Sequence, residues 1–315
     1  MLANFENLNK PEYFFRPSQI WQRIQRSTEN NVINNFSSVI LPWKAQIKVH
    51  PDDTIGRAIY MTGVYDLIVT EMLWRLIEQG EIAIDVGANI GYMTSIMAAK
   101  VTQTGKVYCY EPHPEIYQEL LENITSWQES MGWHNIIPRE IAISDKSGSN
   151  VLTIPDGFDK NRGLSKIETN NNVLTINESS LIQKSYLVSV STLDKILDLN
   201  QSFQIGVLKI DIEGHEFEAL NGAKQMISQQ KIRDIIFEEH NSNPSLVTNF
   251  LQKYGYTIFK AVGGFWGPII CSPESQITGR DWEPPCYLAT INPARVVQRT
   301  KAWGWHSLHN RIDLV

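Results

Sequence analysis

Residues 81–91 hold the feature that most constrains this chain, a short apolar run that ends in a carboxylate and a glycine-containing turn. The run Ile-Ala-Ile is typical of a parallel strand buried on both faces. Asp85 follows, and Gly87, Asn89 and Gly91 alternate through the turn. Glycine, and to a lesser degree asparagine, tolerates left-handed backbone. Because helical spacing begins after Gly91, the pattern predicts a strand, a turn and a helix whose N-terminus faces a ligand.

The spacing of this turn, D-x-G-x-N-x-G, separates two classes of nucleotide-binding protein. Dinucleotide dehydrogenases have G-x-G-x-x-G directly after the strand and hold a pyrophosphate at the helix N-terminus. A carboxylate in the turn is unfavourable beside a pyrophosphate, whereas it suits a ligand with an ammonium group. S-adenosylmethionine has that group, a sulfonium and no phosphate. The spacing therefore disfavours an NAD-dependent oxidoreductase, although a strand–turn–helix unit can also be purely structural.

A second strand-like run, at residues 106–110, ends at Glu111 and Pro112. A carboxylate at the tip of the second strand is placed to accept both hydroxyls of an adenosine ribose. His113 is expected to cap the next helix, and Pro114 fits its first turn. The two stretches together predict a binding site for an adenosine-containing methyl donor.

Further runs of the same kind continue the alternation of strands and helices along the chain. The strands are expected at residues 82–84, 106–110, 136–144, 205–210, 232–237, 256–262 and 287–291. This alternation predicts an α/β fold with a doubly wound, mostly parallel, seven-stranded sheet. In such sheets the ligand lies at the carboxyl ends of the strands. Acids or histidines end four of the strands, at Asp85, Glu111, Asp211 and residues 238–240.

Five motifs in this order resemble the FkbM family of class I S-adenosylmethionine-dependent methyltransferases: DVGANIGYMT, YCYEPHPEIYQELLENI, IAISDKSG, VSTLD and LKIDIEGHEFEALNGA. The resemblance covers roughly residues 62–292. It implies a Rossmann-like methyltransferase fold and S-adenosyl-L-methionine as donor, with S-adenosyl-L-homocysteine as product. Patterns and resemblance together predict a donor site of Tyr65, Asp85, Gly87, Ala88, Asn89, Gly91, Tyr92, Glu111, Pro112, Ala142 and Asp211. In this site Asp85 and Glu111 hold the amino-acid and ribose ends of the donor.

The chain is expected to divide into three parts. Residues 1–61 are interpreted as an N-terminal cap or lid with a helix at 17–26 and a strand at 39–49 that is interrupted at Pro42, although an extra packing layer fits the sequence equally well. Residues 62–292 form the methyltransferase domain, with a β-hairpin insertion at about 148–191 whose polar tip is expected at 168–177. Residues 293–315 form a C-terminal tail. The aromatic residues near the C-terminus, among them Trp266, Trp282 and Trp303, suit an acceptor pocket, a dimer contact or closure of the fold.

Composition limits the compartment and the partners. The net charge of −6 gives no basic footprint for a nucleic acid, and no apolar stretch is long enough to span a bilayer. Three cysteines without C-x-x-C spacing are typical of free thiols, and the start lacks the pattern of a signal peptide. The sequence therefore predicts a cytoplasmic protein without nucleic-acid or membrane partners, which acts on a small-molecule or natural-product acceptor and can form a homodimer.

Methyl transfer to a hydroxyl needs a base near the fourth or fifth strand end. The candidates are Asp211, Glu213, His215 and His240, and the near-neutral pKa of histidine slightly favours the two histidines. Asp211 with residues 238–240 also offers ligands to Mg²⁺, but the spacing is not diagnostic, and no metal is predicted.

The leading hypothesis is an S-adenosylmethionine-dependent O-methyltransferase of a small-molecule, sugar-bearing or natural-product hydroxyl, as the FkbM resemblance implies. Two alternatives remain open. One is N-methylation of an amide or amine in a peptide or small molecule. The other is a non-catalytic module that retains the cofactor-binding fold.

Overall fold

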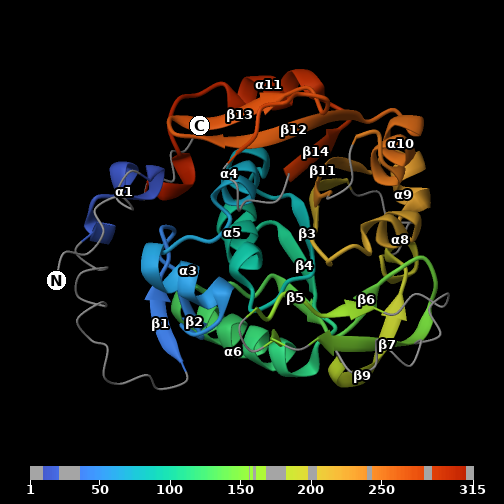
Figure 1. Ribbon diagram of the computed structural model, residues 1–315, viewed down its shortest axis with the longest axis horizontal. Helices are drawn as coiled ribbons and strands as arrows, with labels where there is room; N and C mark the ends of the chain where they lie inside the picture. Colours follow the sequence, from blue (N-terminus) through green and yellow to red (C-terminus); the bar gives the residue numbers. More distant parts are fainter. Residues whose placement is uncertain are drawn as a thin grey trace.

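The computed structural model describes residues 10–20, 36–155, 157–158, 161–167, 182–197, 204–239, 243–279 and 286–309. Within these residues, an eight-stranded sheet with the order β13-β12-β14-β11-β10-β3-β4-β5 forms the centre of the molecule (Figure 1). The strands are β3 (Ile82–Val86), β4 (Lys106–Tyr110), β5 (Ile136–Arg139), β10 (Ile205–Ile210), β11 (Ile232–Glu238), β12 (Thr257–Gly264), β13 (Gly267–Cys271) and β14 (Cys286–Thr290).

The direction of the strands confirms the predicted α/β fold. β5, β4, β3, β10 and β11 run parallel, whereas β14, β12 and β13 add an antiparallel edge. The expected number of strands was wrong by one, because β13 was interpreted as loop. Gly267 and Pro268 conceal it in the sequence, yet an edge strand accommodates proline since one side of its backbone has no partner.

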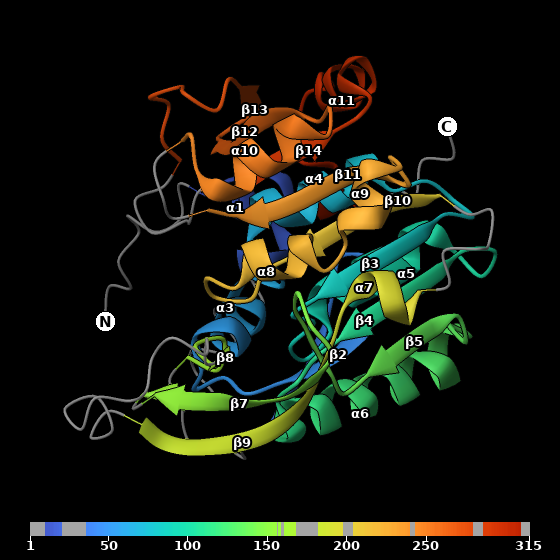
Figure 2. The ribbon, with the colours of Figure 1, turned by 90° about the vertical axis from the view of Figure 1, so that its right-hand side faces the viewer.

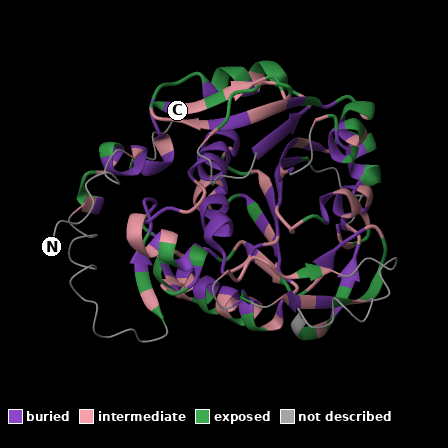
Figure 3. Ribbon diagram, viewed as in Figure 1, coloured by how far each residue is buried: buried purple, intermediate pink, exposed green. Residues whose placement is uncertain are grey.

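Helices cover both faces of the sheet and enclose two apolar cores (Figures 1 and 3). One face carries α4 (Leu67–Leu76), α5 (Tyr92–Val101) and α6 (Pro114–Met131), and the other carries α7 (Leu193–Ile196), α8 (Glu216–Asn221), α9 (Lys224–Ser228) and α10 (Leu246–Lys253). All six residues of β10 are buried, as expected for a strand covered on both sides. His113 caps α6 and Pro114 begins it, as predicted.

The N-terminal part consists of α1 (Pro11–Phe15), β1 (Ser37–Ile40), β2 (Gln46–Val49) and α3 (Thr54–Thr62). β1 and β2 form an antiparallel hairpin in place of the broken strand expected at 39–49. Trp127 Nε1 on α6 donates to the carbonyl of Gln46 over 2.6 Å, which joins the hairpin to the core. The sequence did not indicate α3, and most of the helix expected at 17–26 lies outside the described residues.

The insertion forms a second sheet of β6 (Ala142–Ile143), β9 (Ile182–Ser191), β7 (Gly148–Pro155) and β8 (Lys166–Ile167) in that order. β7 and β9 pair antiparallel and form the predicted hairpin, which extends along one side of the molecule (Figure 2). Lys184 Nζ and Tyr186 Oη on β9 both donate to Glu115 on α6, over 2.6 and 2.5 Å. The polar tip expected at 168–177 lies outside the described residues.

The chain beyond residue 292 packs against α4 as α11 (Pro293–Thr300) and the short 3-10 helix η4 (His306–Leu308). A buried ion pair fastens this segment, because Arg75 donates to three of its carbonyls and Glu71 accepts two of its amides. Trp305 is 1% exposed and closes the fold. No helix in the described part of the chain combines the length and apolar character needed to cross a membrane.

Candidate active site

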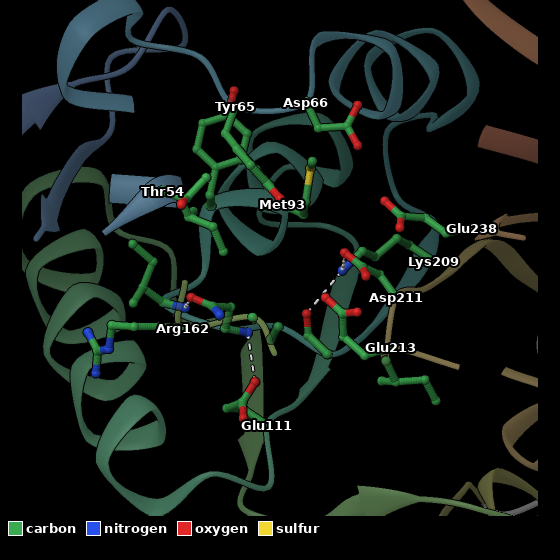
Figure 4. Close-up of a pocket in the computed structure, with 18 of the residues that line it drawn as sticks. Thr54, Tyr65, Asp66, Met93, Glu111, Arg162, Lys209, Asp211, Glu213 and Glu238 are labelled. Carbon is green, nitrogen blue, oxygen red and sulfur yellow. Dashed lines mark hydrogen bonds and ion pairs between the residues drawn. The ribbon is translucent and has the colours of Figure 1, made fainter. Parts of the chain in front are cut away.

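A cavity of about 1040 Å³ opens at the carboxyl ends of the parallel strands. The ends of β3, β4, β10 and β11 contribute to its lining, as do α3, α4, α5 and the insertion (Figure 4). Ligand pockets usually measure about 300–1,000 Å³. This cavity can therefore hold a nucleoside donor together with a second molecule. The predicted donor-site residues that line it are Tyr65, Gly87, Ala88, Asn89, Tyr92, Glu111, Pro112, Ala142 and Asp211.

The turn after β3 adopts the left-handed backbone that its glycines and asparagine predict. Gly87, Asn89 and Gly91 have φ values of 78°, 50° and 94°. A Cβ on Gly87 would lie 2.0 Å from the carbonyl oxygen of Asp211, so the turn and the end of β10 touch through backbone. Gly91 does not line the cavity. It allows the start of α5 to approach Leu120 on α6, since an added Cβ would lie 2.7 Å from Leu120 Cδ1.

The amides of this turn are used inside the protein, contrary to the expectation that they face a ligand. The amides of Gly87 and Ala88 both donate to the carbonyl of Tyr110 over 3.0 Å. The Asn89 amide donates to Glu111, and the Ile90 amide donates to the Asn89 side chain. A pyrophosphate needs free amides at such a turn. The arrangement thus agrees with a ligand that carries no phosphate.

Asp85 lies behind the cavity and does not line it, contrary to its predicted contact with the donor. Its carboxylate is fully buried and accepts a hydrogen bond from Thr94 Oγ1 over 2.7 Å. Lys209 Nζ lies 3.2 Å from the other carboxylate oxygen in an ion pair without the angles of a hydrogen bond. Asp85 can reach a ligand only through Lys209.

Glu111 lies at one end of the cavity and is held entirely by backbone groups. Its two oxygens accept the amides of Asn89 and His113, each over 2.9 Å. Figure 4 shows Glu111 with one of these hydrogen bonds. A carboxylate has about four lone-pair positions, which leaves about two for ligand hydroxyls. Burial raises the pKa of Glu111 to about 7, although the two amides and Lys209 act in the opposite direction. This geometry fits a ribose with two adjacent hydroxyls.

The wall next to Glu111 is apolar, as a purine requires. Pro112, Ala142 and its neighbours Ile141 and Ile143 line it. His215 also lines this wall, with Nε2 2.9 Å from Ser144 Oγ and Nδ1 3.7 Å from Glu218. Burial lowers the pKa of His215. Both ring nitrogens therefore face protein groups, which is a poor arrangement for a general base.

The opposite end of the cavity gathers acidic side chains from several elements. Asp211 follows β10, Glu238 ends β11, and Asp66 caps α4 through the amide of Val69 (Figure 4). Burial, followed by the charge of Asp211, raises the pKa of Glu238 to about 9. Lys209 Nζ lies 3.4 Å from Asp211 Oδ2 and donates to the carbonyl of Gly87 over 3.0 Å. This end suits a cationic group.

Glu213 occupies the left-handed region, with φ 54°. Such backbone costs about 1–3 kcal/mol for residues other than glycine and is frequent at functional sites. Glu216 holds the loop, because its carboxylate accepts the amides of Ile212 and Gly214 over 3.2 and 3.1 Å. The loop thus directs the Glu213 side chain into the cavity (Figure 4).

The two predicted tyrosines line the cavity near Asp66. The rings of Tyr65 and Tyr92 meet edge to face at 6.3 Å, and Trp43 packs on Tyr92 at 5.4 Å. The Tyr92 hydroxyl lies 3.3 Å from Thr70 Oγ1. Burial raises the pKa of both tyrosines, so they remain neutral phenols at physiological pH.

The N-terminal segment and the insertion meet above the strand ends. A Cβ on Gly163 would lie 3.6 Å from Glu213 Oε1 and 3.7 Å from Ile55 Cδ1. Arg162 fixes this loop through a bidentate pair with Glu119 on α6, with both distances 2.7 Å. His50 Nε2, which follows β2, lies 3.2 Å from the same carboxylate. The cavity is therefore completed by the N-terminal segment, which precedes the strands of the central sheet in the sequence, and by the insertion, which lies between β5 and β10.

Some predicted features lie elsewhere. His240 and Trp282 are outside the described residues. Trp266 and Trp303 stack on each other at 5.7 Å but do not line the cavity, so neither belongs to an acceptor pocket there. In the part of the chain that the structure describes, no group of three or more His, Cys, Asp and Glu side chains is arranged to hold a metal ion.

Lys209 and Arg162 are among the residues of the cavity that the sequence analysis missed. Lys209 carried a signal, because a lysine within an otherwise apolar buried strand is unusual. Arg162 carried none, since a basic residue in a polar loop is common on any surface.

Comparisons with known proteins agree with this geometry. The chain is 26% identical over 212 residues to the hexuronic acid methyltransferase AglP of Haloferax volcanii, covering 67% of this chain and 77% of that protein. It is 36% identical over 93 residues to a protein-L-isoaspartate O-methyltransferase of Aeropyrum pernix, covering 29% of this chain and 32% of that protein.

Among solved structures, the methyltransferase FkbM of Methylobacillus flagellatus KT aligns with a TM-score of 0.42 at 18% identity. The alignment covers 74% of this chain and 52% of that one, so this chain spans about half of that protein. The sequence model of the methyltransferase FkbM domain matches residues 85–258. Because this match spans more than half of the sequence, the chain belongs to the FkbM methyltransferase family.

Proposed function

We propose that this protein transfers a methyl group from S-adenosylmethionine to a hydroxyl of a small-molecule, sugar-bearing or natural-product acceptor. One observation carries the proposal. A single cavity holds a backbone-bound carboxylate at one end, Glu111, and an acidic group around Lys209 at the other. These ends match the ribose and the ammonium group of the donor. When bound, the donor supplies a methyl group on a sulfonium.

Each part of the wall has a role in this proposal. Glu111 accepts the ribose hydroxyls, and Pro112 and Ala142 pack against the adenine. Asp211 accepts the ammonium group, and Lys209 keeps the carboxylate in place. The roof of the cavity, where Gly163 approaches Ile55 and Glu213, excludes water and limits the space for the acceptor.

Glu213 is the proton acceptor in this proposal. Its carboxylate reaches the place where the insertion and α3 approach the strand ends, which is where a second molecule enters. Asp211 is already paired with Lys209, and the ring nitrogens of His215 face Ser144 and Glu218. Glu213 therefore replaces His215 as the favoured base, while His240 lies outside the described residues.

The relative from Haloferax volcanii supports a sugar as acceptor, because its name describes methylation of a hexuronic acid. A sugar offers several adjacent hydroxyls, whose protons suit the carboxylates of Glu213 and its neighbours. Among the proposed acceptors, we therefore favour polyhydroxylated ones.

The test is mass spectrometry of hydroxylated metabolites and sugars incubated with the protein and S-adenosylmethionine, seeking a product heavier by one methylene. Glu213→Gln should lower turnover by about 100- to 10,000-fold while the affinity for S-adenosylhomocysteine stays unchanged. His215→Asn is the control and should change turnover far less. Full activity of Glu213→Gln would remove the base assignment and favour an acceptor nitrogen. Tighter binding of NADH than of S-adenosylhomocysteine would overturn the donor.

A further inference from the structure

Lys209 is a charged residue in a place where packing alone favours an apolar one. It is 3% exposed, and every other residue of β10 is buried as well. Burying an ammonium is unfavourable unless it is paired, and apolar replacements of buried ion pairs are often neutral or stabilising. The position therefore calls for an explanation beyond the stability of the sheet.

The contacts of Lys209 connect three parts of the donor site. Its Nζ donates to the Gly87 carbonyl over 3.0 Å and lies 3.2 Å from Asp85 and 3.4 Å from Asp211. Only the Gly87 contact has the geometry of a hydrogen bond, and the two carboxylates hold the ammonium as ion pairs on either side of it. Lys209 and Asp85 are neighbours in the register of β10 and β3, so the sheet itself fixes the pair.

The two carboxylates that flank Lys209 differ in their access to the cavity. Asp85 is fully buried and is held from behind by Thr94, whereas the side chain of Asp211 is 32% exposed and lines the cavity. Figure 4 shows Lys209 beside Asp211, with Glu238 and Asp66 on the same side of the cavity. Without the ammonium, the Asp211 carboxylate would lose the cation that lies 3.4 Å from it.

We propose that Lys209 is a positioning residue that holds the Asp211 carboxylate and the Gly87 carbonyl toward the ammonium group of the donor's amino-acid end. Asp85 is its buried counter-ion. This inference rests on the proposed function, because it assumes that the donor's ammonium group binds at the acidic end. It deepens that function by assigning the orientation of the groups that recognise this ammonium to a buried cation, which acts through Asp211 and Gly87.

Two nucleosides separate this role from general stability. S-adenosylhomocysteine has the ammonium group, whereas 5′-methylthioadenosine has the same adenosine and no amino-acid part. Lys209→Met alone leaves the Asp85 carboxylate buried without a partner and can unfold the protein. The informative variant is therefore Lys209→Met with Asp85→Asn, compared with Asp85→Asn alone by calorimetric titration and thermal unfolding.

We expect the double variant to bind S-adenosylhomocysteine at least about tenfold more weakly than Asp85→Asn, the loss of roughly one charge-assisted interaction. Its affinity for 5′-methylthioadenosine should stay within about twofold of that of Asp85→Asn. The matched control removes a different buried ion pair by Glu71→Gln with Arg75→Met. This pair lies on α4, away from the cavity. This control should lower the thermal stability without discriminating between the nucleosides.

Equal losses of affinity for both nucleosides, or no loss for either, would overturn the role of Lys209. A failure of the proposed function has a different signature, because the unmodified protein would then bind neither nucleoside. That outcome would remove the donor site, and the role of Lys209 with it.

Discussion

The two ends of the cavity hold carboxylates by different means. At the ribose end, Glu111 is bound by two backbone amides, one from His113 two residues later and one from Asn89 in the preceding strand–turn unit. At the acidic end, Asp211 is paired with the Lys209 side chain, and Glu238 lies close to the charge of Asp211. Burial raises the pKa of both Glu111 and Glu238, but the amides oppose this shift at Glu111, whereas neighbouring carboxylates increase it at Glu238.

This difference teaches how the two ends select their ligands. At the ribose end, fixed amides orient the Glu111 carboxylate toward neutral hydroxyls, so the net charge of the ligand matters little for binding at this end. A group of carboxylates around one ammonium carries excess negative charge and favours a cation. The ribose end is therefore expected to depend on single hydrogen bonds, and the acidic end on the balance of charges.

Gly87→Val should have the largest effect, because the turn joins both ends. A Cβ would lie 2.0 Å from the Asp211 carbonyl oxygen, and a β-branched residue is strongly disfavoured at φ 78°. We expect binding of both nucleosides to fall by more than about a hundredfold, together with a lower melting temperature. Calorimetry and thermal unfolding measure the two effects.

Gly163→Ala is the matched control for this substitution. No atom lies closer than 3.4 Å to its added Cβ, so its melting temperature should stay near that of the unmodified protein. Normal nucleoside binding by Gly87→Val would show that the turn and β10 do not need to touch.

Glu111→Gln and Asp211→Asn sharpen the comparison directly. The first should weaken S-adenosylhomocysteine and 5′-methylthioadenosine alike, by roughly 10- to 100-fold, because both contain the ribose. The second should weaken only S-adenosylhomocysteine, by roughly tenfold or more. Parallel calorimetric titrations measure this. If Asp211→Asn weakened both nucleosides equally, the two ends would not be independent.

The pH dependence of 5′-methylthioadenosine binding isolates the ribose end. The pKa of Glu111 is raised to about 7, and the charged form accepts the ribose hydroxyls. Affinity should therefore be constant above about pH 8 and fall by up to about tenfold for each unit below pH 7. Glu111→Gln should give a flat profile between pH 5.5 and 8.5. A flat profile for the unmodified protein would contradict the charged carboxylate as acceptor.

Glu238→Gln should have the smallest effect and concerns stability. The pKa of Glu238 is raised from 4.5 to about 9, so the folded state binds its proton more tightly than the unfolded state does. This contribution to stability is complete below about pH 4.5 and is lost as pH rises toward 9. The neutral amide should then stabilise the protein by roughly 1–2 kcal/mol at pH 8 and hardly at pH 5.

Thermal unfolding at both pH values measures this difference. Glu111→Gln is the comparison at the other end. The carboxyl of Glu111 is largely ionised near pH 8, and the single side-chain oxygen of glutamine cannot replace both oxygens that accept the backbone amides. A stabilisation by Glu238→Gln that is equal at pH 5 and pH 8 would contradict the charge repulsion at the acidic end.

The sequence by itself determined the features that depend on neighbours along the chain. The strand at β3, the left-handed turn through Gly87 and the carboxylate Glu111 after β4 follow from apolar runs and turn chemistry. The cap of α6 by His113 is likewise local. The ribose end was therefore predictable, because its hydrogen bonds join consecutive strand–turn units.

Only the tertiary structure decided which side chains of distant segments meet. Asp85 pairs with Lys209 because β10 inserts beside β3, and this strand order is not written in either strand. The same pairing moved Asp85 from the predicted ligand contact to a buried counter-ion. His215, the N-cap residue of α8, lies beside Ser144 for the same reason, because only the folded chain brings these two segments together.

The roof shows this limit most clearly. It brings together Ile55 on α3, Arg162 in the insertion and Glu213 in the loop after β10. These residues converge only in the folded chain. Their contacts depend on how α6 holds Arg162 and on the fit of α3 above the sheet. Local patterns specify elements. Polar contacts between residues 43 and 122 positions apart depend on packing, because apolar burial, and not charge, sets where the elements lie.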